Sequence, residues 1–504
     1  MELKFRNKAA FCFGAFGKDI AYMVVNSYIL YYYNSVLGMS ATFIGTIMML
    51  ARVFDAANDP FMGVVVAKTK TKFGKFRPWI FCGTLLNALI IYALFAVPNM
   101  GSAGQRTWLA VLYVLWGVTY TLMDIPFWSM IPAITKPGKD REQLSSLARS
   151  FSGIGDAVPT VLTMVVVPIL AGVASIPSNE RIPSTYKPGF MWWALLVAVV
   201  FLVSEIVFVL NVPEKTDVEM EATPIKDMFK ALIRNDQAMA MVVTVVLVYT
   251  AFNIISNLIL YFFQYDLGDT GSYSVFTAIC FGTQVIIMLL VPTMRKKVEK
   301  LRLFSLGIIA QIIGFLVLLA LSFTGLYHAT GWIIFAIPGI LVFAGYGILN
   351  VMLTVFLSDT VDYGEFLNGT REESVIFSMQ TFTVKLASGV GVFLAGIAID
   401  SIGLVVDDKI KTLLNLKADV DSKEYAKAVL ENKDAIIAKF QGLTVDASGI
   451  VHQSASTLKG LMIWMTIPST IVIILAFIVF KKHFKLTEEK MAEVTAKIGK
   501  KEEN

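Results

Sequence analysis

The sequence predicts an all-α polytopic membrane protein with twelve transmembrane helices. Hydrophobic residues make up 56% of the 504 residues, charged residues only 16%, and the mean hydropathy is +0.67. A soluble domain of this size carries roughly a quarter charged residues. The charges are also clustered, which leaves apolar blocks of about 20 residues, long enough to cross a bilayer. We therefore expect the lipid bilayer, and not nucleic acid, to be the partner of this surface.

Charged or turn-forming links separate the apolar blocks into twelve spans. Their approximate ranges are 11–36, 40–67, 78–98, 106–133, 144–173, 189–211, 237–264, 272–294, 302–324, 331–357, 373–403 and 458–480. The first block contains Lys18 and Asp19 and lacks a small-residue cleavage site, so we expect a retained helix rather than a signal peptide. Cys12, Cys82 and Cys280 all fall within spans, so no disulfide framework is expected.

Basic residues in the short links predict the orientation. The links KTKTKFGKFRP (68–78) and RKKVEKLR (295–302) each carry five Lys or Arg, whereas LGMS (37–40) has none and QYDLGD (264–269) has only acids. Cytoplasmic links carry the excess of cations. We therefore expect both termini on the cytoplasmic side of a bacterial plasma membrane.

The basic links follow the second span of each six-helix half, which is the pattern of two related halves. The expected domains are an N-terminal six-helix bundle (1–211), a cytoplasmic middle loop (212–236), a C-terminal six-helix bundle (237–480) and a cytoplasmic tail (481–504).

An external loop at 404–457 interrupts the C-terminal half. Within it, Tyr425, Val429, Ile436 and Phe440 recur at near-helical intervals with charges between them. We expect a short amphipathic helix resting on the outer surface, with a functional lid as the alternative.

Polar residues inside the spans mark a candidate site, because an ionisable group at membrane depth is costly unless it is paired or hydrated. In ARVFDAANDP (51–60), Asp55, Asn58 and Asp59 share one helix face, next to Arg52. Together with the Thr121 hydroxyl they offer the oxygen ligands that hard cations prefer. The two carboxylates repel each other unless a cation or proton intervenes. These residues therefore predict a cation site for sodium or a proton.

A second polar group points to a sugar. Tyr120, Asp124 and Trp128 follow one another at intervals of four on one face of the fourth span, and Asp19 and Arg149 lie in spans one and five. Carboxylates and a guanidinium bind hydroxyls, while an indole offers a flat face to the C–H side of a ring. His328, His452 and His483 lie outside the spans, so a transition-metal site is not expected.

Several other buried charges have no obvious constellation. Asp156 shares a face with Arg149, and Glu205 stands in the sixth span; structural and functional roles are both open for these two acids. The second half is lighter in charge, with Asp359 and Lys385 among its few ionisable residues.

Seven motifs, in order and at similar spacing, resemble the glycoside–pentoside–hexuronide:cation symporters of the major facilitator superfamily, and within them the melibiose permeases. They are FGAFGKD (13–19), ARVFDAANDP (51–60), GKFRPWI (74–80), WGVTYTLMDIPFWS (116–129), REQL (141–144), DTVDYGE (359–365) and QTFTVK (380–385). The resemblance covers about residues 1–400. It implies the major facilitator architecture, with a substrate site near the membrane midplane.

Position by position, the resemblance implies roles for named residues. Cation ligation falls to Asp55 and Asp59 with Asn58 and Thr121 assisting; contact with the sugar or its support falls to Lys18, Asp19, Tyr120, Asp124, Trp128 and Arg149. Thr381 and Lys385 match in the second half, with Lys385 near the acids of the cation site. The chain departs from melibiose permeases at Asn350, where they have a tryptophan, and in the long 404–457 loop.

The sequence therefore favours a monomeric secondary active transporter that imports a glycoside with a cation, expected to be sodium, and needs no organic cofactor. A proton-coupled importer of a xyloside, β-glucoside or glucuronide is the nearest alternative. A sugar sensor that binds without transporting is the alternative from another class, and a lipid carrier suits the polar cluster less well. No paired nucleophile and base or HExxH motif indicates an enzyme.

Overall fold

The computed structural model describes residues 4–69, 71–135, 139–214, 233–324, 330–368, 373–417, 420 and 422–502. The chain folds into two units. Unit 1 comprises residues 1–222, 263–275 and 399–455, and unit 2 comprises residues 223–262, 276–398 and 456–504. Most of the middle loop that the sequence predicts, residues 215–232, lies outside the described residues.

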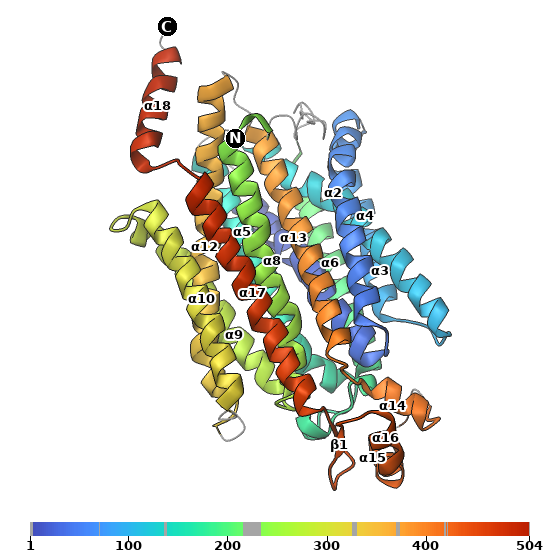
Figure 1. Cartoon of the computed structure of the whole chain (residues 1–504). Coiled ribbons are helices and arrows are strands. Elements are labelled where there is room, and N and C mark those ends of the chain that lie inside the picture. Colours follow the sequence, from blue (N-terminus) through green and yellow to red (C-terminus); the bar gives the residue numbers. More distant parts are fainter. Residues whose placement is uncertain are drawn as a thin grey trace. The chain divides into compact units, whose positions relative to one another are not determined.

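The first 222 residues supply the long helices of unit 1 (Figure 1). These elements are α1 (Phe5–Tyr31), the π-helical turn η1 (Tyr32–Val36), α2 (Ala41–Lys68), α3 (Arg77–Phe95), α4 (Ser102–Ile134), α5 (Lys139–Leu170), the 3₁₀ turns η2 (Ser178–Glu180) and η3 (Pro183–Tyr186), and α6 (Lys187–Asn211). α1 packs against both α5 and α6, and α4 packs against α2 and α3. Their buried contacts are rich in aromatic rings, such as Tyr32, Phe95 and Phe190.

Unit 2 contains most of the remaining long helices. They are α8 (Asp236–Tyr265), α9 (Thr270–Arg295), α10 (Lys300–Thr324), the 3₁₀ turn η4 (Trp332–Phe335), α12 (Ala336–Asn368), α13 (Glu373–Ser401), α17 (Ala455–His483) and the tail helix α18 (Glu488–Glu502). At one end of this unit, Lys300 Nζ lies 2.6 Å from Asp359 Oδ2, and Arg295 Nη2 lies 2.7 Å from Glu488 Oε1 of α18.

Each of the twelve predicted spans corresponds to a helix. Among the described residues, ten helices are long and apolar enough to cross a membrane. The other two predicted spans are α1 and α2, which have 27 and 28 residues and carry Lys18, Asp19, Arg52, Asp55 and Asp59. The least apolar spans are therefore those that hold the candidate polar groups.

The connecting segment between α13 and α17, residues 404–454, has a small core of its own. It contains α14 (Asp407–Leu413), α15 (Ser422–Glu431), α16 (Lys433–Lys439) and the antiparallel strands β1 (Thr444–Val445) and β2 (Val451–His452), gathered together in Figure 1. Tyr425, Val429 and Ile436, three of the four residues with the predicted helical spacing, are buried in this core. The expected amphipathic helix is thus present as two short helices.

Residue Asp400, at the end of α13, satisfies the beginning of α2. The first N–H groups of a helix have no partner within the helix and need an acceptor. Asp400 accepts hydrogen bonds from Ser40 Oγ at 2.7 Å, Thr42 N at 2.8 Å and Ala41 N at 3.3 Å. Gly38, in the turn before α2, has φ +75° and no room for a side chain because Asp408 lies against it. The connecting segment is therefore fastened to the rest of unit 1.

Asp407 is the most buried acid of the connecting segment. Tyr425 Oη donates to its Oδ1 at 3.2 Å, while Oδ2 is buried without a hydrogen-bond partner among the described residues. Burial raises the pKa of Asp407 to about 6 from an ordinary value of 3.8, although Lys411 and the Tyr425 hydroxyl act in the opposite direction. The folded segment therefore binds this proton more tightly than the unfolded chain does.

Acidification is expected to stabilise the connecting segment. A carboxyl whose pKa is raised by folding adds stability as the pH falls from above 6 toward 4, so the free energy of local opening should rise by about 2 kcal/mol between pH 7.5 and pH 4.5. Hydrogen exchange of the 404–454 amides in the full chain, corrected for intrinsic rates, measures it. Asp407→Asn should lose most of the effect and Asp434→Asn, at an exposed position, should keep it. Equal protection at both pH values in the unmodified chain would contradict this expectation.

Candidate functional site

The candidate sugar group of unit 1 is organised around one ammonium. Lys18 Nζ lies 2.6 Å from Asp19 Oδ1 and 2.8 Å from Asp124 Oδ1, and the side chains of Lys18 and Asp19 are almost completely buried. α1 supplies the lysine and one acid, and α4 supplies the other acid. A buried charge is tolerated only when it is paired and hydrogen-bonded, and here one cation serves two carboxylates.

Asp19 receives two further donors. Tyr120 Oη donates to Asp19 Oδ1 at 3.0 Å, and Ser152 Oγ of α5 donates to Asp19 Oδ2. Gly155, one turn beyond Ser152, allows this close approach, because a side chain there would collide with the backbone of Phe16 on α1. Three helices therefore fix the orientation of one carboxylate.

Trp128 provides the flat apolar face of the group. Its ring has the Arg149 guanidinium carbon 3.9 Å from the ring centroid and Lys18 Nζ 4.9 Å from it. A cation over an indole face is an attractive contact. The structure thus brings all six residues predicted for the sugar, Lys18, Asp19, Tyr120, Asp124, Trp128 and Arg149, into one connected set.

The candidate cation group lies on α2 and α4. Thr121 Oγ1 donates to Asp59 Oδ1 at 3.0 Å, and Asp55 is buried, with Arg52 Nη1 at 3.6 Å from its Oδ2. Two carboxylates and a hydroxyl, with the Asn58 amide one residue away, are the oxygen donors that a hard cation prefers. The donor set therefore fits a monovalent cation.

Residues that the sequence analysis did not select complete this group. Arg52 Nη2 donates to Asn26 Oδ1 at 3.0 Å, and its guanidinium lies over the rings of Tyr22 and Trp116. Gly117 of α4 lies against the Asp55 carboxylate, where a side chain would collide with it. Tyr22 and Asn26 follow Lys18 at intervals of four, so helical spacing was the signal that could have found them.

α4 contributes to both groups within one turn. Tyr120 belongs to the sugar group and Thr121 to the cation group, and they are neighbours in the chain. Thr121 and Asp124 are three residues apart, which is about 4.5 Å along a helix axis.

The residues predicted in the second half lie in unit 2. Thr381 is exposed and Lys385 is partly buried on α13, and the predicted nearness of Lys385 to the acids of α2 stays a prediction. At the position of the family's tryptophan, Asn350 Nδ2 donates to Tyr249 Oη at 2.9 Å.

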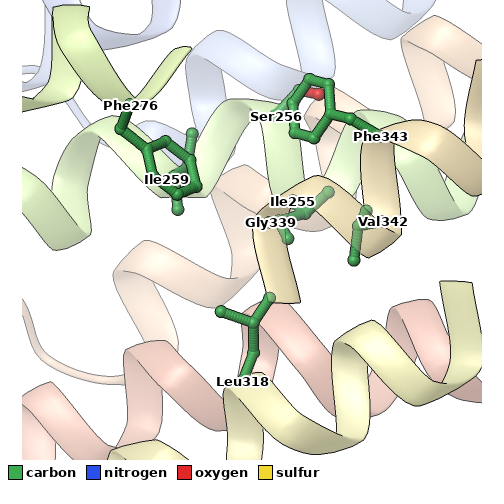
Figure 2. A pocket seen from close by; sticks show the side chains of 8 residues that line it. All are labelled: Ile255, Ser256, Ile259, Phe276, Leu318, Gly339, Val342 and Phe343. Carbon is green, nitrogen blue, oxygen red and sulfur yellow. The ribbon is translucent and has the colours of Figure 1, made fainter. Parts of the chain in front are cut away.

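A small apolar pocket of unit 2 is unrelated to any predicted site residue. Figure 2 shows its eight lining residues, of which Ser256 is the polar one. Its free space is about 10 Å³, the room of roughly one water molecule. A sugar ring does not fit there.

Comparison with known proteins agrees with these features. Residues 10–429 match the family described as MFS/sugar transport protein. The chain is similar to an isoprimeverose transporter of Lactiplantibacillus pentosus, with 28% identity over 78% of this chain and 79% of the relative. It is also similar to a putative sulfoquinovose importer of Salmonella typhimurium, with 29% identity over 83% of this chain and 86% of the relative.

Solved structures show the same fold at low identity. A bacterial homolog of the human lysosomal transporter Spinster matches with a TM-score of 0.64 and 12% identity over 95% of this chain and 99% of that chain. The nucleoside transporter NupG matches with a TM-score of 0.62 and 13% identity over 94% of this chain and 100% of that chain. The predicted all-α major facilitator fold class is confirmed. The chain belongs to the MFS/sugar transport protein family and is a multi-pass membrane transporter rather than an enzyme.

Proposed function

We propose that the chain is a symporter of the glycoside–pentoside–hexuronide:cation type, which moves a glycoside into the cell together with a monovalent cation, sodium in the first instance. The observation that carries this proposal is the Lys18–Asp19–Asp124 cluster, with its Trp128 face, next to the oxygen donors of α2 on the same turn of α4. Relatives named as an isoprimeverose transporter and a lactose permease support a sugar as cargo.

In this proposal each group has a distinct task. Asp19 and Asp124 accept hydrogen bonds from sugar hydroxyls, Lys18 and Arg149 donate to sugar oxygens, and the Trp128 ring packs against the C–H face. Asp55 and Asp59 hold the cation with Asn58 and Thr121, and the cation relieves the repulsion between the two carboxylates. The protein needs no other cofactor, and one copy of the chain holds both groups.

The identity of the sugar is a separate matter. Asn350 and its hydrogen bond to Tyr249 occupy the position of the family's tryptophan, so one aromatic wall of a melibiose-type site is changed. This difference favours a xyloside, β-glucoside or glucuronide as the second candidate cargo, with proton coupling as the second candidate mode.

Uptake into membrane vesicles tests the proposal directly. A radiolabelled panel of melibiose, a methyl xyloside, a methyl β-glucoside and a methyl glucuronide, each under an inward sodium or proton gradient, should give accumulation of at least one glycoside above its external concentration. Binding without accumulation would instead indicate a sensor. The gradient that drives accumulation identifies the coupling ion.

Asp59→Cys is expected to separate coupling from binding. Loss of one oxygen donor next to Thr121 should abolish sodium-driven accumulation, while some sugar binding and downhill exchange remain. Asp434→Cys, at an exposed position, is the matched control. Sodium-driven accumulation at the original level in Asp59→Cys would remove this residue from the cation site.

Substitutions in the sugar group should weaken binding severely. Asp19→Ala, Asp124→Ala and Arg149→Ala each remove one partner of a buried polar pair, and an unsatisfied buried group costs about 1–3 kcal/mol, so we expect about tenfold to hundredfold weaker binding. Titration calorimetry with the glycoside from the uptake panel measures the affinity. Lys427→Ala, on an exposed face, is the control. Unchanged affinity in two of the three variants would place the sugar elsewhere.

Coupling between the two groups should depend on the Thr121 hydroxyl. Coupling is reciprocal, so sodium and sugar must tighten each other's binding by the same factor, typically about 5–150-fold. Thr121→Ala is expected to bring this factor toward one, whereas Thr121→Ser keeps the hydroxyl and should keep the factor. Each ligand is titrated with and without the other. Equal sugar affinities in saturating sodium and in sodium-free choline buffer would exclude sodium as the coupling ion.

A further inference from the structure

Glu205 is a buried acid that the proposed sites do not use. It is the one acid of α6, in a helix of otherwise strongly apolar character. Only 1% of the residue is exposed, and neither carboxyl oxygen has a hydrogen-bond partner among the described residues of the protein. One turn before and one turn after it lie the buried rings of Phe201 and Phe208. An ionised carboxylate in such surroundings is tolerated only next to a cation.

The crossing of α1 and α6 places this acid behind the sugar group. Gly17 of α1 lies directly against Ser204 of α6, so closely that a side chain at position 17 would collide with it. The next residues along the two helices are Lys18 and Glu205. Lys18 is also the one cation that acts electrostatically on Glu205.

The charges around Glu205 do not balance. From α1 and α4 the groups that act on it are Lys18, Asp19 and Asp124. On α5, Asp156 and Arg149 interact with the same Lys18–Asp19 pair. The titratable side chains of α3, Arg77, Cys82 and Tyr92, are not among the charged groups that act on Glu205. Two cations therefore face four carboxyl groups.

The positions of the charges show which form of Glu205 suits this arrangement. Lys18 Nζ is committed to Asp19 at 2.6 Å and to Asp124 at 2.8 Å, and it donates no recorded hydrogen bond to Glu205. A neutral carboxyl leaves the ammonium where it is. An ionised one would compete with Asp19 and Asp124 for the same ammonium and would repel both acids.

We propose that Glu205 is a proton-binding residue of the sugar site, which leaves Lys18 on Asp19 and Asp124 while it is protonated and draws that ammonium away when it is ionised. The proposal rests on the proposed sugar site and adds a proton site to it, separate from Asp55 and Asp59. The protonated form holds Asp19 and Asp124 in the arrangement that meets the sugar. Because linkage is reciprocal, sugar binding takes up a proton at this residue.

The first experiment reads the proton without any sugar. Infrared spectra of the full-length protein in detergent and saturating sodium chloride are recorded across pH, with the carbonyl stretch of protonated carboxylic acids as the signal. A titrating band should be present in the unmodified chain, absent in Glu205→Gln and unchanged in Glu431→Gln, which alters an exposed residue. A spectrum of Glu205→Gln identical to that of the unmodified chain would overturn the proposal. So would loss of the titrating band from Asp156→Asn with no change in Glu205→Gln.

The second experiment counts protons during binding. Titration calorimetry with the glycoside selected by the uptake panel, in saturating sodium and in buffers of different ionisation enthalpy, should give an uptake between zero and one proton per sugar. Sugar affinity should fall by at most about tenfold per pH unit as the pH rises. Glu205→Gln should bind with the affinity of the acid limit at every pH, and Glu431→Gln should behave like the unmodified chain. A proton count of zero in saturating sodium would overturn the proposal.

The two experiments separate this proposal from the proposed function. If no glycoside is taken up, the proposed function fails, and the infrared titration still decides whether Glu205 binds a proton. A folding defect of Glu205→Gln, visible by size-exclusion chromatography, does not affect the proton count on the unmodified chain.

Discussion

The Lys18 ammonium, shared between Asp19 and Asp124, is the interaction on which the polar interior of unit 1 depends. These groups are held by α1 and α4 at 2.6 and 2.8 Å, and Asp19 adds Tyr120 and, through Ser152, α5. Charges in an apolar interior are stable only as a complete set. The positions of three helices are thereby tied to the geometry of one charge cluster, and the Trp128 face is fixed as a result.

A single turn of α4 gives the two polar groups a common support. Tyr120 and Thr121 are consecutive and point about 100° apart on a helix, so one contacts Asp19 and the other contacts Asp59. Gly117, one turn earlier, lets the same helix approach Asp55 closely. A shift or rotation of this turn would alter both groups at once, which is a direct physical route for energetic coupling between them.

Much of this arrangement could be predicted from spacing within single helices. The intervals of Tyr120, Asp124 and Trp128, and of Asp55 and Asp59, place those side chains on common faces, and the apolar blocks predict every long helix. Contacts between helices could not be predicted in this way, because nothing in the local pattern of Ser152, Asn26 or Gly117 says which helix lies opposite. For the same reason, the attachment of Asp400 to the start of α2 has no signal in either segment.

The Asp400 attachment also affects how the protein is made. Ser40 and Asp400 are 360 residues apart, so at about 5–20 residues per second the ribosome needs tens of seconds between them. During that time the nascent chain holds the start of α2 without its acceptor, and the turn at Gly38 without Asp408 beside it. Unit 1 is thus completed only near the end of translation, when residues 399–455 have emerged. A chain released before that point carries an exposed, uncapped helix end that marks it as unfinished.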